Sequence, residues 1–185
     1  LHIISSPRKD LSALLGDHSW LHGRRPDLDQ TLLSPFSDIK VKVHIQHEPL
    51  GLGNAIETAL DDVSGPFLVL LGDNILLDSH TPTNQFIPSN ASKKLVENFE
   101  KNGLPCAGLL AISPHEVSNY GVVRLEGERI QEICEKPNVE DAPSNLVMCG
   151  RYLFTPDAKS LLQKYDVESH GELQSIVLQQ HWMNN

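Results

Sequence analysis

Runs of apolar and polar residues predict three strands in the first part of the chain. Residues 1–5 are mostly apolar, residues 41–45 alternate apolar with polar side chains, and residues 67–71 are continuously apolar. Apolar residues at helical spacing lie between these runs, around Leu11 and around Ile56. This strand–helix–strand–helix–strand order predicts two βαβ units, and the unbroken third run is typical of a parallel strand buried on both faces.

The second half of the chain predicts one helix followed by strands with short connections. Residues 92–101 are amphipathic and end at Gly103, a residue suited to the left-handed cap of a helix. Further strands are predicted at residues 107–112, 121–125, 129–134 and 146–154. Gly127 marks a hairpin turn, Thr155 is the expected N-cap of a helix, and residues 172–182 predict another helix.

Together these elements predict an α/β fold, a Rossmann-like three-layer sandwich with a mainly parallel central sheet and a mixed or antiparallel extension. The length of 185 residues suits a single domain. In open parallel sheets, ligands bind at the carboxyl ends of the strands. The segments that follow residues 45 and 71 are therefore the first expected binding segments.

The composition narrows the class of protein. Acidic residues outnumber basic ones by 24 to 15, a net charge of −9, which argues against binding nucleic acid through a broad basic surface. Cys106, Cys134 and Cys149 lack the spacing of a metal or redox motif and fit reduced thiols. The sequence shows no bilayer-length apolar run and no secretory signal, so we expect a cytoplasmic protein without a membrane or nucleic-acid partner.

A glycine-containing segment follows the second predicted strand. Glycines at 51 and 53 let backbone pass close to a flat ligand and present N–H donors. Gln46, at the strand end, carries an amide whose donor and acceptor match the edge of uracil or thymine. An ordinary glycine turn before a helix explains the same residues, and spacing alone favours that explanation.

A second candidate follows the third predicted strand, at Gly72 and Asp73. A carboxylate directly after a buried strand is well placed to hold Mg²⁺, which prefers carboxylate and phosphate oxygens. An Asx-turn that leads the chain out of the sheet accounts for the same residues equally well. The residues alone leave both explanations open.

The third and fourth candidates lie in the second half. Tyr120 and Gly121 begin a predicted strand, and Glu135 with Lys136 ends the next one. The carboxylate supplies an acceptor for sugar hydroxyls and the lysine a cation for a phosphate, although a surface ion pair is the simpler explanation of the two. Asn145, at the start of a strand, either binds sugar hydroxyls or shapes the turn.

Taken in order, these motifs resemble those of the sugar-1-phosphate nucleotidyltransferases, most closely the bacterial type of UTP–glucose-1-phosphate uridylyltransferase (UDP-glucose pyrophosphorylase). The resemblance rests on Gly51-Leu-Gly53, Leu70-Leu-Gly-Asp-Asn74, Tyr120-Gly-Val122, Glu135-Lys-Pro137, and Ala142-Pro-Ser-Asn-Leu146 with Gly150-Arg-Tyr152. The spacing from Gln46 to Gly51 is also similar to the thymidylyltransferase branch.

The resemblance implies an enzyme that joins UTP to glucose 1-phosphate, giving UDP-glucose and pyrophosphate, with Mg²⁺ as cofactor. The implied site residues are Gln46 and Gly51 for the pyrimidine, Gly72 for substrate, Asp73 for the catalytic metal, Tyr120, Gly121, Glu135 and Asn145 for the sugar, and Lys136 for its phosphate. It also implies a homo-oligomer, a nucleotide-binding part in residues 1–77 and a sugar-phosphate-binding part in residues 104–185. A thymidylyltransferase that uses dTTP, or a non-catalytic regulator that binds nucleotide sugars, remains an alternative.

The sequence also departs from the family pattern. The family begins with a strand and a glycine-rich loop carrying an arginine, and no such segment precedes Leu1 in this sequence. Where the family has Thr and Asp after a Gly-Glu-Ile-Gln-Leu motif, this chain has Ile176 and Val177. Because losing a cationic or metal clamp on a phosphoryl group costs on the order of 10³ in rate, we expect an incomplete chain with little or no activity alone.

Overall fold

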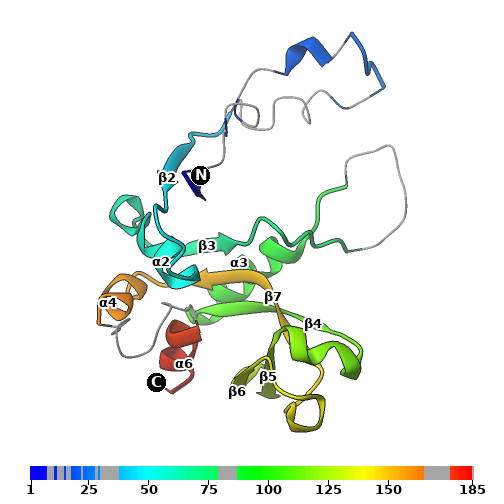
Figure 1. Cartoon of the computed structure of the whole chain (residues 1–185), viewed down its shortest axis with the longest axis vertical. Coiled ribbons are helices and arrows are strands. Elements are labelled where there is room, and N and C mark those ends of the chain that lie inside the picture. The colour runs from blue at the N-terminus through cyan, green and yellow to red at the C-terminus, as the bar shows by residue number, and fades with distance from the viewer. Residues whose placement is uncertain are drawn as a thin grey trace.

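The computed structural model describes the chain except for residues 8–10, 12–14, 16–17, 22, 28, 30–37, 79–86, 165–175 and 185. Its strands form two sheets (Figure 1). The smaller sheet contains β1 (His2–Ser5) and β2 (Lys42–Ile45). The larger sheet contains β3 (Phe67–Leu70), β4 (Cys106–Ala111), β5 (Gly121–Glu126), β6 (Arg129–Glu135) and β7 (Leu146–Phe154).

The helices connect and cover these strands. The α-helices are α2 (Leu52–Glu57), α3 (Ala91–Asn102), α4 (Ala158–Leu162) and α6 (Ile176–Asn184). The 3-10 helices are η1 (Ser19–Leu21), η3 (Leu60–Asp62), η4 (Pro114–Asn119) and η5 (Val139–Asp141). Within the described part of the chain, none of these helices has the length and apolar character needed to cross a bilayer.

The predicted α/β class is confirmed, and so is the parallel pairing of the first two strands, in which Ile3 lies opposite Val43. The predicted parallel pairing and two-sided burial of residues 67–71 is wrong. β3 runs antiparallel to β7, with Leu70 opposite Arg151, and Leu70 is 51% exposed. β7 has nine residues and offers backbone hydrogen-bonding groups to all four residues of β3. Because β3 pairs with β7 alone, it is an edge strand among the described residues.

The local signals at helix and hairpin ends are mostly confirmed. α3 ends at Gly103 with a φ of 70°, and the β5–β6 hairpin turns at Gly127 with a φ of 60°. The helix predicted from Thr155 begins instead at Ala158, because a single turn, closed by the Ala158 N–H donating to the Thr155 carbonyl at 3.0 Å, precedes it. Most of the predicted helix around Leu11 lies outside the described residues.

Strand β7 organises the larger sheet. Strand β4 pairs with β7 from Leu153 to Leu146 and therefore occupies one of its two edges. β3 pairs with residues 151–154 of β7, whereas β5 pairs with residues 146 and 147. Since a strand has only two edges, β3 and β5 share the second one, end to end. The carboxyl end of β3 therefore meets the start of β5 near Gly150.

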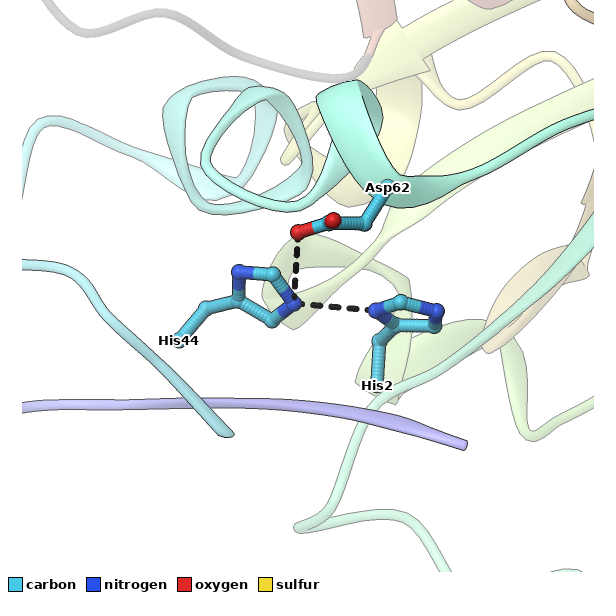
Figure 2. A group of neighbouring side chains, drawn as sticks. All are labelled: His2, His44 and Asp62. Carbon is cyan, nitrogen blue, oxygen red and sulfur yellow. Dashed lines mark hydrogen bonds and ion pairs between the residues drawn. The ribbon is translucent and has the colours of Figure 1, made fainter. Parts of the chain in front are cut away.

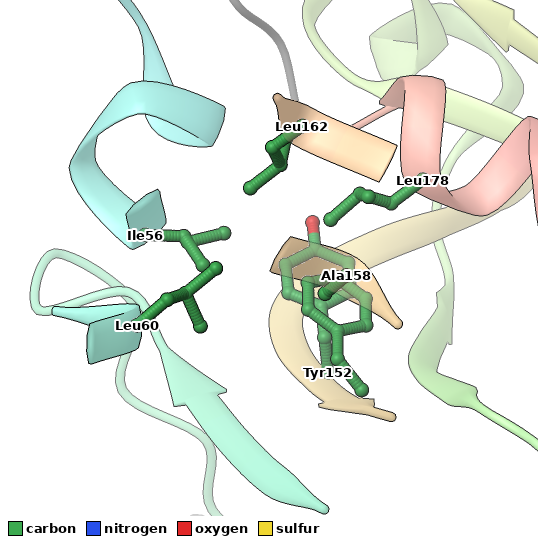
Figure 3. Close-up of a cluster of buried hydrophobic side chains, with 7 residues drawn as sticks. Ile56, Leu60, Tyr152, Ala158, Leu162 and Leu178 are labelled. Atoms are coloured by element: carbon green, nitrogen blue, oxygen red, sulfur yellow. The ribbon is translucent and has the colours of Figure 1, made fainter. Parts of the chain in front are cut away.

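The main hydrophobic core fixes α2 and η3 against β7 (Figure 3). Its buried residues come from α2, η3, β7, α4 and α6: Ile56, Leu60, Tyr152, Phe154, Ala158, Leu162 and Leu178. Leu52, at the start of α2, and Leu71, just after β3, both pack against this cluster. The segments that precede α2 and follow β3 are thus anchored on the same core.

Candidate functional site

The turn that carries Asp73 is held by an arginine from β7. Arg151 donates from one guanidinium nitrogen to the Leu71 carbonyl at 3.1 Å and from another to the Asn74 carbonyl at 2.6 Å. Gly150, with a φ of 68°, lets β7 pass close beneath the turn, since a Cβ there would lie 2.9 Å from Nδ2 of Asn74. The position of the turn is therefore set by β7.

Asp73 lies at the surface of this turn. One carboxylate oxygen accepts a hydrogen bond from Nδ2 of Asn74 at 2.7 Å, and the side chain is exposed. A magnesium ion in a nucleotide site uses one or two protein carboxylates together with substrate phosphates. An exposed carboxylate on an anchored turn fits that requirement, so Asp73 could hold such an ion.

Gly121 and Glu135 face each other across the β5–β6 ladder, beside β7. A Cβ built on Gly121 would lie 2.9 Å from a carboxylate oxygen of Glu135 and 2.5 Å from Cε of Met148. Only glycine therefore leaves room for the Glu135 carboxylate over the backbone of β5. The geometry places an acceptor suited to sugar hydroxyls at the point where β3 and β5 meet.

Lys136 follows directly and has an unusual backbone. Its φ is 46°, the left-handed region that L-residues rarely adopt, and its N–H donates to the Tyr120 carbonyl at 3.0 Å. Such a conformation costs on the order of 1–2 kcal/mol in a residue other than glycine. No ion pair within the described part of the chain joins Lys136 to Glu135, so the surface-pair explanation of these two residues receives no support.

We call this meeting point the β3–β5 junction; it consists of Asp73, Gly121, Glu135 and Lys136. The strand registers bring its members together from three strand ends: the carboxyl end of β3, the start of β5 and the end of β6. Gly72 lies on the same turn, and Tyr120 lies next to Gly121. Along this stretch of β7 the strand ends thus carry a carboxylate for a cation, an ammonium for a phosphate and an acceptor for hydroxyls.

Gln46 braces the segment that follows β2. Its amide nitrogen donates to the Gly51 carbonyl at 3.1 Å and to Oδ1 of Asn54 at 2.9 Å. Both amide N–H groups thus have partners within the protein. A base could therefore form hydrogen bonds only with the amide oxygen of Gln46 or with backbone groups. Gly51 has a φ of 98°, which explains the need for glycine and supports the turn explanation alongside the binding one.

Asn145 is tied to the segment that follows β4. Its side-chain amide donates to the Ile112 carbonyl at 2.9 Å, and the Ile112 N–H donates back to the Asn145 carbonyl at 3.0 Å. The turn-shaping explanation is thus the better supported one, although Asn145 borders an open depression of about 450 Å³ beside η4 and η5.

Arg151 was not recognised as a site residue from the sequence. The Gly150-Arg-Tyr152 motif contributes to the family resemblance, but the resemblance implies no role for the arginine. A usable signal existed, because an arginine within a nine-residue strand of otherwise apolar and small residues must find acceptors nearby. What could not be read from sequence was that those acceptors are the carbonyls of the Asp73 turn.

Comparison with known proteins identifies the family. Residues 14–180 match the family described as Nucleotidyl transferase. A UTP–glucose-1-phosphate uridylyltransferase of Streptococcus pyogenes serotype M3 is 32% identical over 136 residues, covering 70% of this chain and 44% of the relative. A Bacillus subtilis protein of the same name is 33% identical over 135 residues, covering 70% and 42%. The chain therefore spans less than half the length of these relatives.

Solved structures agree on the fold. A UDP-glucose pyrophosphorylase complexed with UDP-glucose superposes with a TM-score of 0.79 at 24% identity, covering 100% of this chain and 69% of that one. A UDP-glucose pyrophosphorylase from Acinetobacter baumannii superposes with a TM-score of 0.70 at 25% identity, covering 97% and 66%. These matches confirm a nucleotidyltransferase type of α/β fold.

Proposed function

The chain belongs to the nucleotidyl transferase family, and from this premise we propose that it forms the substrate-binding surface of a UTP–glucose-1-phosphate uridylyltransferase. The observation that supports the proposal is the β3–β5 junction, whose three strand ends carry a carboxylate, an ammonium and a hydroxyl acceptor along one stretch of β7. The uridylyltransferase names of the matching relatives support uracil and glucose as the substrate groups.

The proposed reaction is a displacement at the α-phosphorus of UTP. A phosphate oxygen of glucose 1-phosphate forms the new bond to phosphorus, the bond to the β-phosphate oxygen breaks, and pyrophosphate leaves. Such transfer depends on positioning and on neutralising charge rather than on strong acid–base chemistry. Lys136 would neutralise the sugar phosphate, and Asp73 would hold a divalent cation, proposed as Mg²⁺, that neutralises triphosphate charge.

The remaining residues position the substrate. Glu135 accepts hydrogen bonds from sugar hydroxyls over the bare backbone of Gly121, and Tyr120 borders the same surface. The loop that Gln46 braces meets the pyrimidine through backbone groups of Gly51. Because Leu52 and Leu71 pack on one core, the base loop and the Asp73 turn are held on a common support. The homo-oligomer and the cytoplasmic location stay predictions.

Calorimetric titration of the chain with UDP-glucose tests the proposal. We expect specific binding of UDP-glucose, weaker binding of dTDP-glucose, and at least about tenfold loss of affinity in Lys136→Ala, since a charge-assisted contact to phosphate is worth about 1.5–3 kcal/mol. Lys101→Ala, which removes an exposed lysine at the end of α3, serves as the matched control and should bind like the wild type.

Two results would count against the proposal. Equal affinities of the Lys136→Ala and Lys101→Ala variants would remove Lys136 from the phosphate site. Tighter binding of dTDP-glucose than of UDP-glucose would favour the thymidylyltransferase alternative.

A further inference from the structure

A cluster of two histidines and an aspartate lies outside the proposed substrate site (Figure 2). Nδ1 of His2 lies 2.9 Å from Nε2 of His44, and that same His44 nitrogen lies 3.8 Å from Oδ2 of Asp62. The three candidate ligand atoms all lie within 4.8 Å of one another. Each side chain therefore places one candidate ligand atom beside the other two.

The fold builds this cluster from segments far apart in the sequence. In the parallel β1–β2 ladder, His2 lies opposite Lys42 and Ile4 lies opposite His44. Residues two apart on a strand face the same side, so both imidazoles project from one face of the sheet. Asp62 ends η3, which approaches that face, as Figure 2 shows.

The separations suit a tetrahedral metal site. Zinc bonded to nitrogen and oxygen ligands at 2.0–2.1 Å has neighbouring ligand atoms about 3.3 Å apart. The His2–His44 separation of 2.9 Å and the His44–Asp62 separation of 3.8 Å bracket that value, so small side-chain rotations would close the site. The imidazole of His44 is only 8% exposed, which limits its rotation and holds one ligand ready.

We propose that His2, His44 and Asp62 bind a zinc-like transition-metal ion, with the fourth position open to water. Two imidazoles and one carboxylate suit zinc and its neighbours, whereas magnesium prefers an all-oxygen set. The site therefore differs in metal class from the one proposed at Asp73. A bound ion would tie β1 and β2 to η3, and it would do so beside Gln46, which directly follows β2.

Lys42 is the competitor for this site. Its ammonium lies 2.5 Å from Oδ2 of Asp62, the carboxylate oxygen nearest to His44. The lysine side chain is 55% exposed and can turn into solvent when a metal arrives. Removing the lysine should therefore strengthen metal binding.

Calorimetric titration with Zn²⁺ tests the proposal on the chain and four variants. His44→Gln and Asp62→Asn each remove one ligand and should weaken zinc binding by at least about tenfold. His115→Gln removes an exposed histidine on η4 and is the matched control, with unchanged affinity expected. Lys42→Gln keeps all three ligands and should bind Zn²⁺ several-fold more tightly than the wild type.

Each other outcome overturns the site. Wild-type zinc affinity in His44→Gln would mean that other histidines bind the ion and that the cluster is a hydrogen-bonded pair only. Should a ligand variant fail to fold, Lys42→Gln decides, because a purely structural role of the cluster predicts unchanged or weaker zinc binding once the Lys42–Asp62 ion pair is lost.

Discussion

At the scale of single residues, the space above Gly121 decides where the Glu135 carboxylate can lie. A methyl group at Gly121 would meet that carboxylate at 2.9 Å and the end of the Met148 side chain at 2.5 Å. Both are the far ends of flexible side chains, so they can move without displacing backbone. The fold should then tolerate a change that the proposed sugar site does not.

We predict that Gly121→Ala lowers the free energy of unfolding by only about 1 kcal/mol, yet weakens UDP-glucose binding by about tenfold or more. The reason is that the Glu135 carboxylate must leave the position from which it would accept sugar hydroxyls. Urea unfolding and calorimetry measure the two effects. Gly23→Ala, where an added methyl group meets nothing within 4 Å, should change neither. Wild-type affinity in Gly121→Ala would contradict the role of Glu135.

A second single residue, the buried Tyr152, makes the stability of the fold depend on pH. Burial raises the pKa of Tyr152 to about 12, and the nearby Cys149 and Glu135 add to the rise. The phenol is neutral in the folded protein beyond the pH at which it ionises in the unfolded chain, near 10. Its contribution to stability is therefore complete below about pH 10 and is lost as the pH rises to about 12.

We predict that wild-type stability falls by on the order of 2 kcal/mol more than that of Tyr152→Phe between pH 9 and pH 12. Urea unfolding at several alkaline pH values measures the difference. Tyr120→Phe, at a tyrosine that is 43% exposed, should follow the wild type. Parallel curves for wild type and Tyr152→Phe would show that ionisation of this buried phenol does not govern alkaline unfolding.

At the scale of elements, the junction depends on how β7 distributes its edge between β3 and β5. Gly150 lies between the two paired stretches, and Arg151 ties the turn after β3 to the strand through the Leu71 and Asn74 carbonyls. A planar guanidinium reaches two carbonyls at once, which a lysine ammonium on a flexible stem does less well. The turn that carries Asp73 should therefore be sensitive to a conservative change at Arg151.

We predict that Arg151→Lys costs about 1–3 kcal/mol of stability and weakens the cation site at Asp73. Chemical unfolding gives the first quantity, and broadening of Asp73 resonances by Mn²⁺ gives the second. Arg124→Lys is the matched control: its partner is the exposed Glu132 on β6, and exposed pairs contribute about 0–1 kcal/mol. Equal losses in the two variants would remove Arg151 from its positioning role.

At the scale of the whole molecule, the sequence predicts the backbone conformation of single turns better than it predicts which strands pair. Gly103 ends a helix and Gly127 forms a hairpin turn. Both roles depend on the positive φ of that one residue, so the sequence predicts them. A short apolar run specifies a strand at residues 67–71, but nothing within it states which edge it will join, so its antiparallel pairing with β7 was missed. The positive φ of Lys136 is likewise not predicted by its residue type, since left-handed backbone is rare outside glycine.

In the candidate site, too, the sequence predicts the residue types but not their arrangement. The motifs single out Asp73, Glu135 and Lys136 as candidates. Their placement relative to one another depends on how β3, β5 and β6 pair, with β7 at the centre. Asn145 belongs to the same motif set, and its hydrogen bonds to Ile112 are a contact that the motif does not specify. The proposed nucleotide and sugar-phosphate parts, residues 1–77 and 104–185, meet in one sheet because β3 pairs with β7.

The measurement that tests the central claim most directly is an NMR titration of the ¹⁵N-labelled chain with UDP-glucose. The account predicts that the largest amide shift changes fall at the β3–β5 junction, on Gly72, Gly121 and Lys136. Changes confined to the depression beside η4 and η5, around Val117 and Ala142, or no saturable changes at all, would contradict it.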